Sequence, residues 1–79
     1  MKVLKFGGTS VANAENISKV ITILKKSAQN EKLAVVVSAL GGTTDLLLEA
    51  GAEAQEGNSH YLEIFKNIEN RHLETVRAL

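Results

Sequence analysis

The stretch that decides the fold lies at the start of the chain and reads Val3-Leu4-Lys5-Phe6-Gly7-Gly8-Thr9-Ser10. Its nearly continuous apolar beginning predicts a short strand over residues 2–6, buried on both faces. The glycine pair ends this strand, and two hydroxyl residues precede a helical pattern. A strand, a glycine turn and a helix N-terminus can cradle phosphate, because N–H groups of residues without a Cβ approach an anion closely. Lys5 offers a point charge for a phosphoryl group.

The next elements follow in the order of a strand–helix–strand unit. Apolar residues recur at helical spacing from Ile17 to Ala28, which predicts a helix over residues 14–29 with Asn13 as its N-cap. The run Leu33–Val37 is rich in β-branched residues and predicts a second buried, parallel strand. The sequence therefore predicts an α/β fold that begins with a right-handed βαβ unit.

A second glycine loop follows the second strand and reads Ser38-Ala39-Leu40-Gly41-Gly42-Thr43-Thr44-Asp45. Loops at the C-terminal ends of parallel strands share one edge of the sheet, so both glycine loops are expected to open onto the same crevice. Either Thr43 or Thr44 is expected to cap a second helix. The buried side of that helix is expected to carry Leu46, Leu47, Leu48, Ala50 and Ala54.

A third helix is predicted after the break at Gly57-Asn58-Ser59. Ser59 is its expected cap, and the helix is expected to run from His60 towards the end of the chain. His72 is interpreted as a hydrogen-bonded packing residue on the apolar side. The apolar stripe of this helix is expected to consist of Tyr61, Phe65, Ile68, His72, Val76 and Leu79, with Ile64 and Leu73 beside it.

Composition narrows the classes of function. Nine basic and nine acidic residues give zero net charge, which argues against nucleic acid and anionic membranes as partners. The chain has no cysteine, and its two histidines are far apart, so no metal site is expected and Mg²⁺ would have to arrive with a nucleotide. The apolar runs are too short to span a bilayer, and no signal-peptide pattern is present, which favours a cytoplasmic location.

The two glycine loops carry a resemblance to a known family. Lys5–Ser10 resembles the N-terminal signature of aspartate kinases, within the amino acid kinase family, and Lys2–Glu15 is most similar to the kinase half of bifunctional aspartate kinase–homoserine dehydrogenases. Ser38–Asp45 resembles the family loop Ser-Ala-Met-Gly-x-Thr-Thr-Asp, with Leu40 in place of methionine. The resemblance implies a sandwich of the amino-acid-kinase type with a mainly parallel sheet, of which residues 1–79 are the N-terminal part of the catalytic domain.

The resemblance also implies an activity, which is transfer of the ATP γ-phosphate to the β-carboxylate of L-aspartate in lysine, threonine and methionine biosynthesis. Lys5 is the implied catalytic residue. The residues implied to bind ATP with its Mg²⁺ are Lys5, Phe6, Gly7, Gly8 and Ser10. The residues implied to border the amino-acid substrate are Ser38, Gly41, Gly42 and Thr44.

The chain is expected to be an incomplete, inactive piece of such an enzyme. It stops within a helical pattern, and the family places its metal-organising aspartate, its substrate-binding arginine and its adenine pocket further along. Because the remaining strands are missing, apolar surface is expected to stay uncovered, which favours a homo-oligomer.

Two alternatives stay open from the sequence. One is a self-standing α/β module that binds anions or a partner without catalysis. The other is an amino acid kinase acting on glutamate, acetylglutamate or a nucleotide, although the Thr9-Ser10 and Thr43-Thr44-Asp45 groups favour aspartate kinase. In the parent gene, a downstream glycine-rich stretch ending in Ser-Asp would favour the enzyme, and a stop codon after Leu79 would favour the module.

Overall fold

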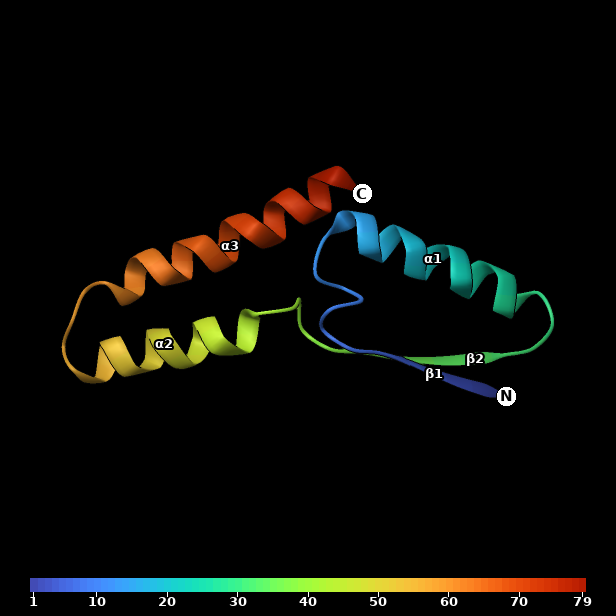
Figure 1. Ribbon diagram of the computed structural model, residues 1–79, viewed down its shortest axis with the longest axis horizontal. Coiled ribbons are helices and arrows are strands. Elements are labelled where there is room, and N and C mark those ends of the chain that lie inside the picture. Colours follow the sequence, from blue (N-terminus) through green and yellow to red (C-terminus); the bar gives the residue numbers. More distant parts are fainter. The chain divides into compact units, whose positions relative to one another are not determined.

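The computed structural model describes residues 1–79 as five elements in the order β1, α1, β2, α2 and α3 (Figure 1). The chain divides into two compact units, Met1–Gly41 and Gly42–Leu79. The first unit holds the parallel sheet and the second unit is helical, so the predicted α/β class is confirmed. The elements are β1 Lys2–Phe6, α1 Ala14–Ala28, β2 Leu33–Val37, α2 Thr43–Gln55 and α3 Tyr61–Ala78.

The first unit is the predicted βαβ unit. Strands β1 and β2 form a two-stranded parallel sheet whose register runs from Lys2 opposite Leu33 to Phe6 opposite Val37. Helix α1 connects the strands and lies beside the sheet (Figure 1). Both strands have the predicted bounds, because glycine ends the first and β-branched residues fill the second.

Helix α1 begins where its cap was predicted. Asn13 has extended backbone angles, and its side chain accepts a hydrogen bond of 2.9 Å from the N–H of Asn16. Glu15 in the first turn and two lysines in the last turn complement the helix dipole. The helix ends at Ala28, one residue before the predicted end, because Gln29 serves as the C-cap.

The sheet is covered less than its apolar pattern suggests. Leu4 and Phe6 are half-buried, whereas Val3 and Lys5, which alternate with them, are exposed. This alternation indicates that α1 covers the face that carries Leu4 and Phe6, since successive side chains of a strand point to opposite faces. The expectation of burial on both faces is therefore wrong, because the unit Met1–Gly41 supplies a single helix to a sheet that needs two layers.

Helices α2 and α3 pack against each other in the second unit (Figure 1). Gly57 ends α2 with a φ of 76°, and Asn58 donates its N–H to the carbonyl of Glu53 over 2.9 Å. The N–H of Gly57 also bonds the carbonyl of Ala54. These two bonds form a Schellman motif, which satisfies the last carbonyls of the helix. The predicted break between the helices is thus confirmed.

Both predicted caps in this unit are wrong. The N-cap of α2 is Gly42, with a φ of 85° and no side-chain cap. Its carbonyl accepts from the N–H of Leu46, so the chain enters the helix before either threonine could cap it. Helix α3 has His60 as its N-cap. Ser59 accepts a hydrogen bond from the N–H of Leu62 with its backbone carbonyl rather than with its hydroxyl.

The contact between these helices is narrower than their apolar stripes. Ile64 is the buried apolar residue of the unit, with 4% of its surface exposed. The predicted burial is wrong for several residues, because within this unit each helix packs against one other helix, which covers only part of a wide apolar face. The Nδ1 of His72 donates a hydrogen bond of 2.7 Å to the Ile68 carbonyl, as predicted. The apolar residues that are exposed against expectation are Leu47, Leu48, Ala54, Tyr61, Phe65, Leu73, Val76 and Leu79.

None of the helices combines the length and the apolar composition that crossing a membrane requires.

Candidate functional site

The first glycine loop is a tight turn that leads from β1 into α1. Its own hydrogen bonds join the N–H of Ser10 to the carbonyl of Gly7 (3.1 Å) and the N–H of Val11 to the carbonyl of Gly8 (3.3 Å). Val11 is buried and anchors the turn. The N–H groups of Gly8 and Thr9 lie outside this set of bonds. These two amides are therefore among the donors that the turn leaves for a ligand.

The second glycine loop lies directly against the first. A Cβ on Gly8 would lie 3.2 Å from the Cα of Gly41 and 3.3 Å from the carbonyl oxygen of Ala39. A Cβ on Gly41 would lie 2.9 Å from the carbonyl oxygen of Gly8 and 3.3 Å from the Cβ of Ala12. Neither glycine has a positive φ, so both positions need glycine for space. The glycines allow two backbone segments to touch.

The ends of the two strands bring further predicted residues together. The N–H of Ser38 donates to the carbonyl of Phe6 over 3.2 Å, which continues the sheet ladder one residue beyond β2. Four of the nine predicted site residues therefore lie at this edge of the sheet, namely Phe6, Gly8, Ser38 and Gly41. The expectation that both loops meet at one edge agrees with this geometry.

Lys5 and Gly7 are placed next to that contact by the chain itself. Lys5 is exposed in β1, opposite Val36 of β2. Gly7 is exposed, and nothing lies within 4 Å of the position of a Cβ on it. The lysine side chain is thus accessible from solvent, as a phosphate-binding ammonium group must be.

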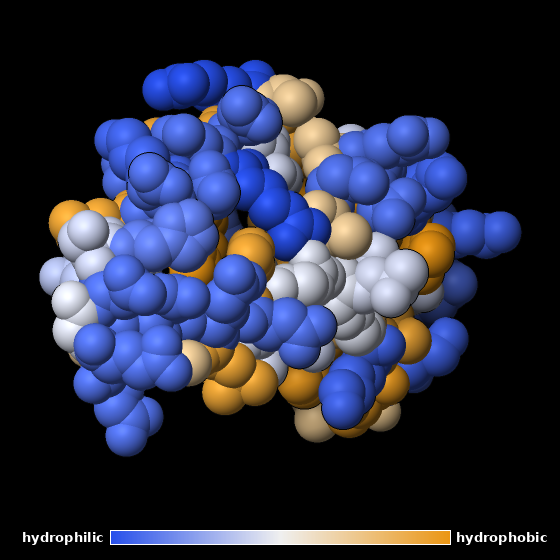
Figure 2. All heavy atoms as spheres, turned by 60° about the vertical axis from the view of Figure 1, so that its left-hand side comes forward, coloured by the Kyte–Doolittle hydropathy of each residue, from blue (hydrophilic) through white to orange (hydrophobic).

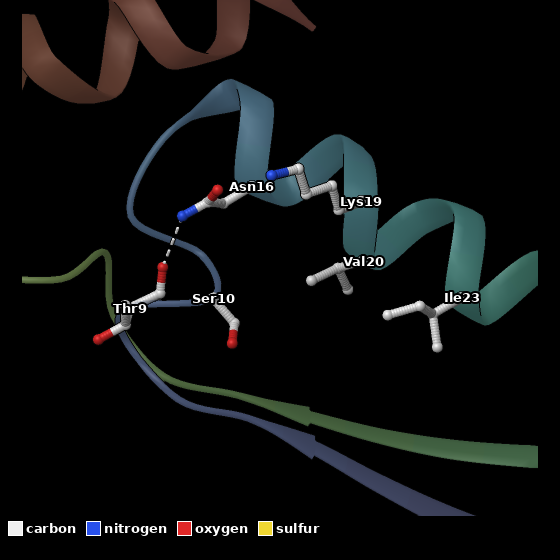
Figure 3. Close-up of a pocket in the computed structure, with 6 residues that line it drawn as sticks. All are labelled: Thr9, Ser10, Asn16, Lys19, Val20 and Ile23. Carbon is white, nitrogen blue, oxygen red and sulfur yellow. Dashed lines mark hydrogen bonds between the residues drawn. The ribbon is translucent and has the colours of Figure 1, made fainter.

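Ser10 borders a pocket between the loop and α1 (Figure 3). The cavity has a volume of about 250 Å³. Its polar side comes from the loop and the first turns of the helix, and its apolar side from the middle of the helix. The lining residues are Thr9, Ser10, Asn16, Lys19, Val20 and Ile23.

The last two predicted substrate residues belong to the second unit. Gly42 is the left-handed N-cap of α2, and Thr44 is exposed in the first turn of that helix. Arg71 of α3 comes near the same helix end, because its Nη1 lies 3.7 Å from the position of a Cβ on Gly42. The hydroxyl of Thr43 is buried there without a hydrogen-bond partner. The beginning of α2 thus combines helix amides, an exposed hydroxyl and a nearby guanidinium.

Sequence reasoning missed Asn16. Its side-chain Nδ2 donates to the carbonyl of Thr9 over 3.0 Å and so ties the loop to α1 (Figure 3). A signal was present in the sequence, because Asn16 follows the N-cap Asn13 by three residues. That is the position from which a side chain reaches back towards the start of its helix.

The groups around the first glycine loop include several hydrogen-bond donors. The structure holds no group of three or more His, Cys, Asp or Glu side chains that could bind a metal ion. The loop amides, the ammonium group of Lys5 and the hydroxyl of Ser10 instead match the acceptor oxygens of a phosphate.

The fold and the site together define a class of protein. A parallel βαβ unit with glycine loops after both strands is an α/β arrangement that binds ligands at the carboxyl edge of the sheet. The sequence model of the amino acid kinase family matches residues 1–78. The chain belongs to this family.

Relatives of this chain are named as aspartokinases or as bifunctional aspartokinase/homoserine dehydrogenases. An aspartokinase of Chlamydia pneumoniae is 42% identical over 77 residues, which is 98% of this chain and 16% of the relative. A bifunctional aspartokinase/homoserine dehydrogenase of Buchnera aphidicola is 38% identical over 76 residues, 96% of this chain and 9% of the relative. The chloroplastic aspartokinase 1 of Arabidopsis thaliana is 38% identical over 80 residues, 98% of this chain and 14% of the relative. The chain thus spans less than a fifth of the length of these relatives.

Proposed function

We propose that this chain is the N-terminal part of the catalytic domain of an aspartokinase. The observation that carries the proposal is the backbone contact between Gly8 and Gly41, which joins the two glycine loops at one edge of a parallel sheet. The names of the relatives support the choice of aspartate over the acceptors of other amino acid kinases. The proposed reaction transfers the γ-phosphate of ATP to the β-carboxylate of L-aspartate.

The first loop is the proposed binding site for the ATP phosphates. Gly7 is exposed and Gly8 is half-buried at the turn, and the amides of Gly8 and Thr9 are outside the internal bonds of the turn. Lys5 supplies positive charge from the strand before it, and Ser10 supplies a hydroxyl. Phe6 is half-buried and supports the strand end through its carbonyl bond with Ser38. Mg²⁺ arrives with the nucleotide in this proposal.

The second loop is the proposed border of the amino-acid site. Ser38 and Gly41 lie at the sheet edge, and Gly42 and Thr44 lie at the N-terminal end of α2. Helix amides and an exposed threonine hydroxyl suit the carboxylates of aspartate, because a helix N-terminus favours negative charge.

The proposed chemistry matches residues of this kind. The β-carboxylate of free aspartate is ionised at neutral pH, so this nucleophile needs no general base. The protein must align two anions and balance the charge of the phosphoryl group in transfer. Amides, a lysine and hydroxyl groups perform that task by fixed electrostatic contacts.

The proposal extends to the parent protein. There the product, aspartyl phosphate, would feed lysine, threonine and methionine synthesis, with or without a homoserine dehydrogenase domain in the same polypeptide. The parent is expected to be a homo-oligomer, and a cytoplasmic location stays a prediction from the sequence. The 79-residue chain alone is expected to be inactive, because it covers so small a share of its relatives.

The test is an assay of the full-length protein with MgATP and several acceptors. An acyl phosphate is trapped by hydroxylamine, so hydroxamate formation reports the reaction directly. We expect a signal with L-aspartate that exceeds those with L-glutamate and N-acetylglutamate by about 100-fold or more, since unpaired polar groups reject the wrong acceptor. A stronger signal with either alternative acceptor, or ATP-independent product, would refute the proposal.

A further inference from the structure

The side chain of Asn16 makes a hydrogen bond to the first glycine loop, and the proposed function assigns no role to this bond. Its Nδ2 donates a hydrogen bond of 3.0 Å to the carbonyl oxygen of Thr9, seven residues earlier (Figure 3). Its backbone N–H meanwhile donates to Oδ1 of Asn13 over 2.9 Å. Asn16 is therefore held at the start of α1 by one bond and holds the glycine loop by another.

The carbonyl that Asn16 binds is at the centre of the loop. Thr9 follows Gly8 directly and precedes Ser10. The same carbonyl also accepts from the N–H of Ala12 over 3.4 Å, which is a long bond. The shorter bond from Asn16 is thus the stronger restraint on this peptide group. A restraint there sets the direction of the peptide that carries the N–H of Ser10.

We propose that Asn16 is a positioning residue of the phosphate loop. It fixes the Thr9 carbonyl towards α1, and so keeps the amides of Gly8 and Thr9 and the hydroxyl of Ser10 in the geometry that receives the ATP phosphates. Asn16 itself touches no reacting atom in this assignment. The inference rests on the proposed function, because it assigns Asn16 to the ATP side of that site.

The chemistry of the contact explains why an amide suits this position. An asparagine side chain donates through its NH₂ group, whereas an aspartate of the same shape only accepts when ionised. An aspartate at residue 16 would face the Thr9 carbonyl with like partial charge. Lys19 is within one turn of it and lines the same pocket, so the carboxylate would turn towards that lysine.

The same replacement is harmless to the helix. Residue 16 is the third residue of α1, where negative charge interacts favourably with the helix dipole. Asn16→Asp therefore removes the restraint on the loop without weakening the helix. Asn13→Asp is the matched control, because it adds the same charge three residues away and aspartate caps helices as well as asparagine does.

The first readout is steady-state kinetics of the full-length protein. Asn16→Asp is expected to raise KM for ATP about tenfold, as loss of one hydrogen bond plus repulsion would do, with KM for aspartate changed less than about twofold. Asn13→Asp is expected to leave both constants within about twofold of wild type, since the cap is kept. Equal increases of both KM values in Asn16→Asp, or no difference from Asn13→Asp, would overturn the assignment.

The second readout needs no catalysis. Amide hydrogen exchange of residues 9–12 is expected to be about tenfold faster in Asn16→Asp than in Asn13→Asp, because local opening becomes easier when the restraint is lost. Exchange in the middle of α1 is expected to be equal in the two variants. Equal exchange of the loop amides in both variants would overturn the positioning role.

The two readouts separate this inference from the proposed function. If the full-length protein phosphorylates aspartate but Asn16→Asp matches Asn13→Asp in KM and in loop exchange, the inference alone fails. If the protein does not phosphorylate aspartate and the loop exchanges faster in Asn16→Asp, the proposed function fails while the restraint of the loop by Asn16 is supported.

Discussion

Lys5 is the single residue on which the proposed chemistry depends most. It is exposed at the end of β1, two residues before the glycine turn. In the full-length protein, Lys5→Met is expected to lower kcat by about 100-fold or more, the scale of losing one fixed electrostatic contact in the transition state. Lys2→Met is the matched control, because Lys2 is exposed on the same strand but lies far from the turn. A Lys5→Met variant with the kcat of Lys2→Met would remove Lys5 from the site.

Thr44 carries the corresponding prediction for the amino-acid side. Its side chain is exposed in the first turn of α2. Thr44→Val keeps the shape and removes the hydroxyl, so KM for aspartate is expected to rise by the equivalent of about 1–3 kcal/mol. KM for ATP is expected to stay nearly constant, and it serves as the internal control of the same kinetic series. A rise in KM for ATP alone would move Thr44 out of the amino-acid site.

At the scale of single residues, the sequence motifs identified the glycines of the site, but they did not give the full reason why residue 8 is glycine. Gly8 was expected to give a ligand room, and the structure adds a second demand, since the backbone of Gly41 fills the space beside it. The role of Asn16 was not predicted from the sequence, because its hydrogen-bond partner is a backbone carbonyl. Side chains that bind backbone leave no complementary residue in the sequence to pair them with.

At the scale of elements, local signals decided what could be predicted. Both strands and α1 are found where they were expected, since a glycine pair, an asparagine cap and a β-branched run act over a few residues. The caps of α2 and α3 were mispredicted because a left-handed glycine replaced the threonine cap and a backbone carbonyl replaced the serine hydroxyl. The buried face of α3 depends on its neighbour, which periodicity alone does not identify.

Helix α2 contains an element-scale test of stability. Gly51 lies inside the helix, and nothing is within 4 Å of the position of a Cβ on it. Gly51→Ala is therefore expected to stabilise the fold by about 1 kcal/mol through the lower entropy of the unfolded chain. Thermal melting of the full-length protein followed by circular dichroism measures this change. A lower Tm in the variant would show that the space around Gly51 is occupied in the parent protein.

At the scale of the whole molecule, exposed apolar surface is the dominant feature. Apolar atoms reach the surface between hydrophilic ones in Figure 2. Large exposed fractions occur in both units, for example 63% for Val3 and 69% for Leu48. Surfaces of this kind are normally covered by further elements or by another chain. The few buried residues leave little free energy of unfolding for a chain of this size.

The 79-residue chain is therefore expected to self-associate in solution. A two-fold dimer that pairs sheet edges or apolar helix faces is the simplest symmetric assembly that would cover this apolar surface. Light scattering after size-exclusion chromatography at micromolar concentration is expected to give at least twice the monomer mass of 8.5 kDa. A monodisperse 8.5 kDa species with a cooperative thermal transition would contradict this expectation.

The central claim is that contact of the second glycine loop with the first shapes the ATP-phosphate site proposed for the first loop, and a graded alanine series tests it most directly. A Cβ would meet backbone at 2.9 Å on Gly41 and at 3.2 Å on Gly8, and would meet nothing within 4 Å on Gly51. In the full-length protein, kcat/KM for ATP is expected to fall about 100-fold in Gly41→Ala and about tenfold in Gly8→Ala, because each displaces the loop backbone in proportion to its clash. Gly51→Ala is the control and is expected to match wild type. If Gly8→Ala and Gly41→Ala use ATP as well as Gly51→Ala does, the contact between the loops plays no part in ATP binding.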